Sequence, residues 1–309
     1  MAENLSILTI EVGSTITKVN GFGKLEDGSF EHLGQGFAAT SISQGDVGLG
    51  VDLALEELKT HYPGRIDHPE TFVNSSAAGG LRMTVHGLTY SMTARAAREA
   101  ALGAGGIVKM VTAGELDEFE LKEIQEINPN IILLAGGVDY GEKEVVLKNA
   151  EKIATSGMKV PVIYAGNAAI RKQIQSIFEQ AGVETMQVSN VFPEVDVLNI
   201  EPVRNVIHNL FNRHIVHAPG MTRFAELTHW GILPTPGAVL KAAELFAEEM
   251  GDCLIFDVGG ATTDVHSVTH GSLEWTSRLI EPEPYAKRTV EGRSEETRLN
   301  SSHRIRYRM

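Results

Sequence analysis

The sequence predicts an α/β protein with parallel or mixed sheets and helices on both faces. Short runs rich in β-branched and apolar residues begin near residues 5, 71, 130, 160 and 253, and each run ends in small residues. Helical patterns separate most of these runs. Near-continuous apolar strands that alternate with helices are typical of a parallel sheet that is covered on both faces. In such sheets, ligands usually bind at the carboxyl ends of the strands.

Three helices are predicted from their apolar spacing and their ends. Residues 46–62 place Val47, Val51, Leu55 and Leu58 on one face, and residues 168–181 repeat the pattern before a glycine stop at Gly182. Residues 234–251 begin with a proline and end with a glycine, which is the usual asymmetry of a helix.

Composition restricts the class of protein. A length of 309 residues allows two domains, and 42% hydrophobic with 22% charged residues is typical of a soluble globular protein. The net charge of −13 argues against nucleic acid as the main partner, and no apolar run approaches the roughly 18 residues of a membrane span. Cys253 stands alone, so we expect a buried structural thiol and a cytoplasmic protein. The eleven histidines form no close ligand pair, so a histidine metal site is not expected.

The stretch LTIEVGSTITKVNGF, residues 8–22, predicts a β-hairpin with a phosphate-binding tip. A strand leads into Glu11, and a second strand begins near residue 17. The tip and its flank carry Gly13, Ser14, Thr15, Thr17 and Lys18. Glycine lets a ligand approach the backbone, whose N–H groups donate to phosphate together with the hydroxyls. The carboxylate beside the tip suits Mg²⁺, which binds phosphate-linked sites through one or two carboxylates.

The stretch CLIFDVGGATTDVHSV, residues 253–268, repeats this plan. Its strand ends at Asp257, and the turn and return strand carry Gly259, Gly260, Thr262, Thr263 and Asp264. One such loop is usually an ordinary turn, but two loops of the same plan about 245 residues apart predict a pair that holds a nucleotide's phosphates from opposite sides. Asp257 and Glu11 are the candidate catalytic residues, and Asp257, Glu11 and Asp264 are the candidate Mg²⁺ ligands.

Two further stretches are weaker candidates. Residues 74–80, NSSAAGG, form either a third phosphate or hinge contact, through Ser75 and Ser76, or a tight turn without a ligand. The stretch DVHSVTHG, which begins at Asp264, has some similarity to the DxHxxG loop that binds cobalamin. Thr269 stands where that loop needs glycine, so we expect a strand and a turn with exposed histidines instead.

The two hairpins resemble the phosphate-1 and phosphate-2 motifs of the actin, sugar kinase and Hsp70 superfamily. Glu11 stands where the first motif usually has aspartate, which shifts the carboxylate by one methylene. Longer blocks resemble the glutamate mutase accessory protein family of MutL type, from about Leu5 to Gly292. These blocks are residues 75–116, NIILLAGGVDYGE, PVIYAGN, PTPGAV and EPYAKRTVEG.

The resemblance implies an actin-like (ribonuclease H-like) ATPase fold that uses ATP and Mg²⁺. It also implies a chaperone-like role, in which the protein reactivates an adenosylcobalamin-dependent partner, glutamate mutase or a related aminomutase, by releasing damaged cobalamin. Cobalamin then belongs to the partner. Asp257 would order Mg²⁺ or the attacking water, and Gly259, Gly260 and Thr262 would hold the terminal phosphate. A small-molecule kinase of the same fold and a non-catalytic nucleotide-binding scaffold are the alternatives.

The resemblance also implies a division of the chain. Residues 1–250 are expected to form a first actin-like domain with an inserted α/β portion at about 105–215, and residues 251–292 to begin an incomplete second domain. The last 17 residues, 293–309, carry a charge of +3 against −16 for residues 1–292. They are expected to be non-native and disordered. We therefore expect the apolar strand faces of the second domain to be open to water, and the chain to bind ATP weakly and hydrolyse it negligibly.

Overall fold

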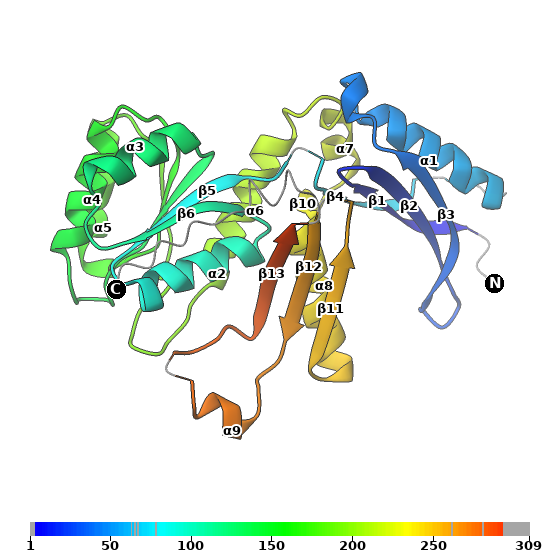
Figure 1. Ribbon diagram of the computed structural model, residues 1–309. Helices are drawn as coiled ribbons and strands as arrows, with labels where there is room; N and C mark the ends of the chain where they lie inside the picture. Colours follow the sequence, from blue (N-terminus) through cyan, green and yellow to red (C-terminus); the bar gives the residue numbers. More distant parts are fainter. Residues whose placement is uncertain are drawn as a thin grey trace.

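The computed structural model of the chain describes residues 4–292 except residues 63, 65, 67, 78, 261 and 280. The tail predicted at residues 293–309 lies outside these described residues. The described part contains three β-sheets. In Figure 1 the sheet that begins the chain and the all-parallel sheet lie on opposite sides of the molecule, and a three-stranded sheet extends below and between them.

The first sheet is mixed. Strands β1, β2 and β3 form an antiparallel meander, and β4 and β10 extend the other edge of β1 in parallel. The strands are β1 (Leu5–Val12), β2 (Ile16–Lys24), β3 (Phe30–Ala39), β4 (Glu70–Ser75) and β10 (Ile232–Pro234). The structure thus confirms the strands and the return strand that the sequence predicts here.

Helix α1 (Gly48–His61) packs on this sheet and confirms the helix predicted at residues 46–62. On its apolar face Val51 and Leu58 are fully buried, and Leu55 is half-buried. A Cβ added to Gly36 of β3 would lie 1.9 Å from the carbonyl oxygen of Ala54. Glycine at this position therefore allows the helix backbone to lie directly on the strand.

The second sheet is entirely parallel, as the sequence predicts. Its strands lie in the order β6-β5-β7-β8-β9, a doubly wound arrangement. The strands are β5 (Arg82–Gly87), β6 (Ile107–Ala113), β7 (Ile131–Leu134), β8 (Val162–Tyr164) and β9 (Thr185–Gln187). All four residues of β7 are buried, which explains its uninterrupted apolar sequence.

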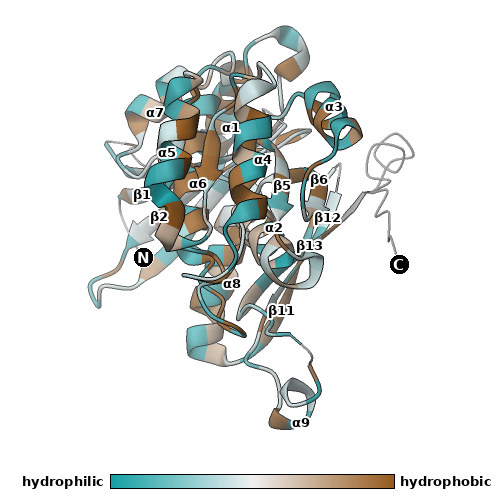
Figure 2. Cartoon of the chain, turned by 90° about the vertical axis from the view of Figure 1, so that its left-hand side faces the viewer, coloured by the Kyte–Doolittle hydropathy of each residue, from teal (hydrophilic) through white to brown (hydrophobic). Residues whose placement is uncertain are grey.

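Helices cover both faces of the parallel sheet. Ile132 and Leu134 pack into a core with α3, α4 and α5, whereas Ile131 and Leu133 point into the core shared with α2 and α6. The helices are α2 (Arg95–Gly103), α3 (Glu118–Ile127), α4 (Glu144–Thr155), α5 (Arg171–Gln180) and α6 (Glu201–Ile215). In Figure 2 several of these helices carry both hydrophilic and hydrophobic bands, as amphipathic helices do. Short helical turns precede α1, α2 and α5, at Ile42–Gln44, Tyr90–Ala94 and Ala168–Ile170.

The third sheet is an antiparallel meander of β11 (Cys253–Val258), β12 (Thr262–Val268) and β13 (Ala286–Gly292). Helix α8 (Thr235–Met250) covers one face and confirms the helix predicted at residues 234–251. Two short helices complete the described part, α7 (Thr222–Leu227) before β10 and α9 (Leu273–Thr276) between β12 and β13.

The expected buried thiol, Cys253, is half-buried at the start of β11. Its Sγ lies 3.6 Å from the carbonyl oxygen of Ala243 on α8, in the position of a weak donor. The side chain is incompletely covered because it lies at the end of a three-stranded sheet. It nevertheless packs against α8, which agrees with a structural role.

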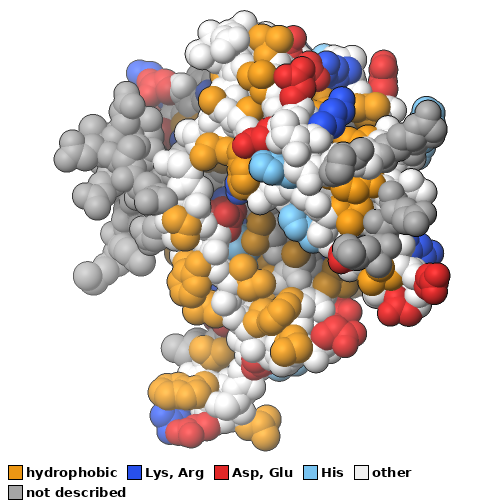
Figure 3. Space-filling view, turned by 90° about the vertical axis from the view of Figure 1, so that its right-hand side faces the viewer, with side chains coloured by type: hydrophobic (Ala, Val, Ile, Leu, Met, Phe, Trp, Pro, Cys, Tyr) orange, Lys and Arg blue, Asp and Glu red, His pale blue; other side chains and the backbone are white. Residues whose placement is uncertain are grey.

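The other face of the third sheet is open. On β11 the side chains of Leu254, Phe256 and Val258 are 54%, 59% and 62% exposed. Figure 3 shows hydrophobic side chains gathered on the side of the molecule that carries β11 and α8. The sequence predicted apolar faces open to water in this region, and the structure confirms this for one face, while α8 closes the other.

The structure groups the elements somewhat differently from the predicted domains. The parallel sheet begins at Arg82, upstream of the insertion expected at about residue 105. Helix α8, which precedes the expected boundary at residue 250, packs on the third sheet rather than only on the first. The division of the chain into two actin-like domains therefore stays a prediction.

Candidate functional site

The two predicted hairpins share one backbone geometry. The N–H of Gly13 donates to the carbonyl oxygen of Ile16 at 3.1 Å, and the N–H of Gly259 donates to that of Thr262 at 2.9 Å. Each tip is thus closed by the same four-residue turn. Two residues before the glycine, Glu11 and Asp257 are the next-to-last residues of β1 and β11, so the carboxylates occupy equivalent positions.

The two tips lie against each other. A Cβ added to Gly260 would lie 2.4 Å from Oγ1 of Thr15, so the backbone of one tip contacts the side chain of the other. Figure 1 shows the β1–β2 turn beside the upper ends of β11 and β12. The structure therefore brings together the two stretches that the sequence pairs across about 245 residues.

The predicted hydrogen-bond donors of the first hairpin lie partly at the exposed tip and partly in the protein interior. Ser14 and Thr15 are exposed at the tip. Thr17 is fully buried, and its hydroxyl shares a hydrogen bond of 3.0 Å with that of Thr40. Lys18 Nζ donates to Glu11 Oε2 at 3.2 Å across the two strands. The candidate carboxylate is therefore neutralised by its own hairpin.

The second hairpin presents an open backbone. Gly259 and Gly260 are exposed, and Asp257, Thr262 and Thr263 are half-buried. Among the described residues, a Cβ added to Gly259 would meet only the carbonyl oxygen of Thr262, at an ordinary contact distance of 3.4 Å. The hairpin itself therefore does not require glycine at residue 259, whereas a ligand that approaches the backbone would.

Asp264 is buried and paired with an arginine of the third strand. Its side chain is 3% exposed, and Arg288 donates to its Oδ2 from Nη2 at 2.9 Å and from Nε at 3.1 Å. Oδ1 of Asp264 is buried and has no hydrogen-bond partner among the described residues. Burial raises the pKa of Asp264 despite the opposing attraction of Arg288, and the neighbouring Asp257 adds to the rise. Burial has the opposite effect on Arg288 and lowers its pKa. Both shifts disfavour the charged form, so burying the pair costs desolvation free energy.

The comparisons with known proteins decide the family. A family model described as "MutL protein" matches residues 7–294. The chain belongs to the MutL protein family. "Protein MutL" of Clostridium tetanomorphum is 40% identical over 295 residues, which cover 92% of this chain. This confirms the resemblance to the MutL type predicted from the sequence blocks.

The chain spans 63% of the length of that MutL relative. Among solved structures, a glycerol dehydratase reactivase shares 10% identity and aligns over 93% of this chain and 43% of its own, with a TM-score of 0.17. A likeness of this size does not bear on the fold of the MutL chain.

In the MutL chain, Ser75 and Ser76 lie beneath the first hairpin. Ser75 is fully buried, and its hydroxyl donates to the carbonyl oxygen of Val12 at 3.2 Å and accepts from the N–H of Ala77 at 3.2 Å. The N–H of Ser76 also donates to Val12, at 3.0 Å. Both serines therefore tie the end of β4 to the first hairpin, and a direct contact of either with a ligand stays a prediction.

One expectation about the histidines is wrong. His266 is fully buried, because on β12 it shares the covered face of the sheet with Asp264 and Val268. Neither ring nitrogen has a partner among the described residues, and burial, together with Arg288, lowers its pKa to about 4. His270, beyond the strand, is exposed and stacks on Tyr285 with ring centroids 4.3 Å apart.

Sequence reasoning missed Arg288. The block KRTVEG contributed to the family resemblance, but the arginine received no role. A signal was present, because residues 286, 288 and 290 alternate with outward-facing residues on β13 and place Arg288 on the same face as two apolar side chains. A charge on a covered strand face requires a partner, and Asp264 supplies it.

The described residues contain no group of three or more His, Cys, Asp or Glu side chains arranged to hold a metal ion. Mg²⁺ bound together with phosphate needs fewer protein ligands, because phosphate oxygens and water complete its shell. The carboxylates of Glu11 and Asp257, one beside each tip, fit that requirement. None of the helices in the described part is long and apolar enough to cross a membrane.

Proposed function

We propose that the two hairpins hold the phosphates of ATP between them, with Mg²⁺ at the adjoining carboxylates. The observation that carries this proposal is the contact between Gly260 and Thr15, which places two tips of the same geometry face to face. Two glycine-containing turns that point at one another present backbone N–H groups and hydroxyls from both sides. That is the donor arrangement that a chain of phosphate groups requires.

The repeated plan of the first and third sheets supports an actin-like ATPase fold. Each sheet begins with a hairpin closed by the same turn, and each continues as an antiparallel meander, β1-β2-β3 and β11-β12-β13. The same hairpin unit is therefore present twice in the described part of the chain. In the superfamily that the motifs resemble, two such units hold one nucleotide.

The proposed roles follow from the position of each residue. Gly259 and Gly260 leave the backbone accessible, and Ser14, Thr15 and Thr262 add hydroxyl donors at or beside the tips. Thr17, Thr263, Ser75 and Asp264 would support the tips from beneath. Mg²⁺ at Asp257 or Glu11 would offset the charge of the phosphates. Asp257, beside the buried Asp264, would hold the ion or orient water.

The family suggests what ATP would be used for. We propose a chaperone-like ATPase that acts on an adenosylcobalamin-dependent mutase, glutamate mutase or a related aminomutase, and drives the release of damaged cobalamin. A nucleotide between two sheets can change their relative position when it is bound or hydrolysed, and this motion can act on a partner. In this proposal cobalamin stays on the mutase.

Phosphate release with and without the mutase tests the function. Release that needs no small-molecule acceptor, and that rises when the mutase is added, supports the ATPase. ADP formation only with a metabolite would favour the kinase alternative, and binding without release would favour the scaffold. Thermal unfolding with increasing ATP·Mg²⁺ measures binding alone, because a ligand of the native state raises the melting temperature even when affinity is weak. The weak binding expected for this chain would appear in the same titration.

Substitutions in the second hairpin test the site. Asp257→Asn should abolish hydrolysis in a full-length relative and preserve the fold. Gly259→Val should remove ATP binding without unfolding the hairpin, because its branched side chain points into the space proposed for phosphate. Thr289→Val, at an exposed position of β13 away from the tip, replaces one β-branched side chain by another and should bind ATP normally. Normal ATP affinity in Gly259→Val would show that the loop is only a turn.

A further inference from the structure

Arg288 connects the second hairpin to a different part of the fold. While Nε and Nη2 donate to Asp264 on β12, Nη1 donates to the carbonyl oxygen of Leu102 at 3.2 Å. Leu102 lies in the last turn of α2, which packs between the parallel sheet and the third sheet. The side chain is 6% exposed, so its contacts are formed out of water. One guanidinium thus joins the hairpin to a helix of the parallel sheet.

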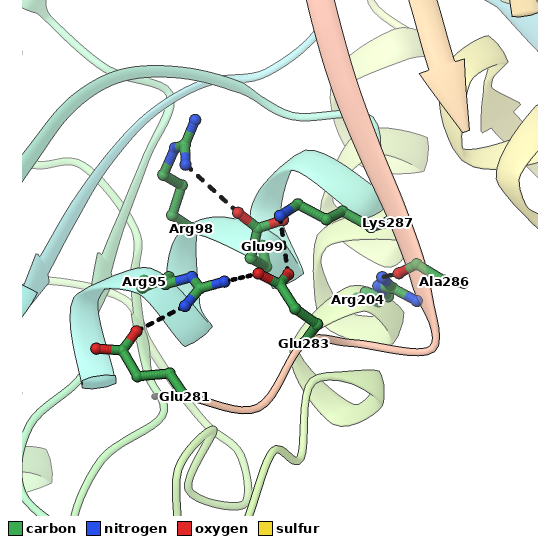
Figure 4. Close-up of polar contacts among 8 residues, drawn as sticks. All are labelled: Arg95, Arg98, Glu99, Arg204, Glu281, Glu283, Ala286 and Lys287. Carbon is green, nitrogen blue, oxygen red and sulfur yellow. Dashed lines mark hydrogen bonds and ion pairs between the residues drawn. The ribbon is translucent and has the colours of Figure 1, made fainter. Parts of the chain in front are cut away.

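The surrounding contacts between α2, α6 and the segment leading into β13 are also polar. Figure 4 shows Arg95 of α2 between Glu281 and Glu283, at 2.6 Å from Glu281, and Lys287 at 2.8 Å from Glu283. Arg204 of α6 donates to the carbonyl oxygen of Ala286 at 2.8 Å. These residues hold the segment against the helices, but none of their contacts reaches Asp264 or the hairpin.

We infer that Arg288 couples the proposed nucleotide site to helix α2, so that occupancy of the second hairpin is transmitted to the parallel sheet. This inference rests on the proposed function. Asp264 pairs in register with Asp257, the acid at the tip, and the two charges already act on each other. A cation or phosphate beside Asp257 changes the charge that Asp264 experiences. Because Arg288 is buried, a change in its pairing with Asp264 must alter its bond to Leu102.

Hydrogen exchange of the full chain with millimolar ATP·Mg²⁺, compared with Mg²⁺ alone, tests the coupling. In the wild type, nucleotide should slow amide exchange about fivefold or more both in residues 253–268 and in residues 100–106, which cover the last turn of α2 and the turn that follows it. Arg288→Lys keeps the charge opposite Asp264 but replaces the planar fork, whose separate nitrogens reach Asp264 and Leu102, by one nitrogen at the end of a shorter donor group. This variant should keep the protection of residues 253–268 and lose that of residues 100–106.

Arg95→Gln is the matched control, because it removes an arginine of the same helix that contacts the segment but not Asp264. It should keep both protections. Asp264→Asn is a second variant, which keeps an oxygen for Arg288 without the charge, and it should also lose protection at residues 100–106. The coupling would be overturned if residues 100–106 stayed protected in Arg288→Lys and Asp264→Asn. It would also be overturned if Arg95→Gln removed this protection to the same extent as those two variants. Absence of protection at both regions in the wild type would overturn the nucleotide site and the coupling with it.

Discussion

The first and second hairpins have the same turn but different surroundings. When the two glycines are aligned, residues 8, 10 and 12 of β1 correspond to residues 254, 256 and 258 of β11. The first three, Leu8, Ile10 and Val12, are 6%, 1% and 0% exposed, whereas the second three, Leu254, Phe256 and Val258, are 54%, 59% and 62% exposed. The local sequence therefore sets the turn, and the neighbouring elements set the burial.

The charges at the two hairpins differ in the same way. Glu11 faces Lys18 in register, so the first hairpin neutralises its own acid near the surface. Asp257 faces another acid, Asp264, and the neutralising charge comes from Arg288 on the third strand. The first hairpin is electrostatically self-contained, whereas the second depends on β13 being in place.

The largest expected difference concerns these charges. Asp264→Ala should lower the free energy of unfolding by about 3–5 kcal/mol, because it leaves Arg288 buried and unpaired. Lys18→Ala, at the equivalent position of the first hairpin, should lower it by less than about 1 kcal/mol, because that pair is partly exposed. Urea unfolding measures both. The double variant Asp264→Leu/Arg288→Met should recover much of the loss caused by Asp264→Ala. Equal losses for Asp264→Ala and Lys18→Ala would contradict the difference in charge pairing between the two hairpins.

The next difference concerns burial. Ile10→Ala should cost about 2–5 kcal/mol of unfolding free energy, because it leaves a cavity in a fully buried core. Phe256→Ala, at the corresponding position, should cost less than about 1 kcal/mol, because more than half of the side chain is exposed. The same unfolding experiment applies. A large loss for Phe256→Ala would indicate that the open face of β11 is covered in solution.

A smaller difference is expected at the turn glycines. A Cβ on Gly13 would lie 2.4 Å from the carbonyl oxygen of Ile16, whereas one on Gly259 would lie 3.4 Å from that of Thr262. Gly13→Ala should therefore destabilise the protein by about 1–3 kcal/mol through strain. Gly259→Ala should change stability by no more than about 0.5 kcal/mol. Thermal unfolding of the two variants decides whether the turns tolerate side chains differently.

The smallest effect is a pH dependence found only in the second hairpin. Its His266 corresponds to Asn20 of the first hairpin, which does not titrate. The unfolded chain protonates histidine near pH 6.5, but the pKa of folded His266 is about 4. Its contribution to stability is therefore present above pH 6.5 and lost as the pH falls.

Between pH 6.5 and 5.5 this contribution should fall by about 1 kcal/mol. Comparison with His266→Gln isolates it, since the variant should lose less stability than the wild type over this interval. NMR titration of the imidazole gives the pKa directly. A value near 6.5 in the folded protein would contradict the burial described above.

The sequence predicts those parts of the structure that depend on local pattern. Apolar spacing identified the helices at residues 46–62 and 234–251, and the spacing of acid, glycine and hydroxyl identified both hairpins. The pair of Asp264 and Arg288 and the burial of His266 were not predicted. The ion pair depends on which strand lies beside β12, and the burial of His266 depends on which face of the third sheet α8 covers. Both arrangements are contacts between residues that are distant in sequence. For the same reason, Thr17 could not be distinguished from Ser14 and Thr15 before its bond to Thr40 was known.

The contact between the two tips also has a consequence for biosynthesis. Thr15 and Gly260 are 245 residues apart, and at about 5–20 residues per second a ribosome adds the second about 12–50 s after the first. During that interval the first hairpin is supported by β3 and β4, both of which lie within the first 75 residues. A ligand that needs both tips cannot assist the folding of the nascent amino-terminal half. A ribosome paused before residue 253 would therefore carry a chain whose first sheet can form but whose site is not yet assembled.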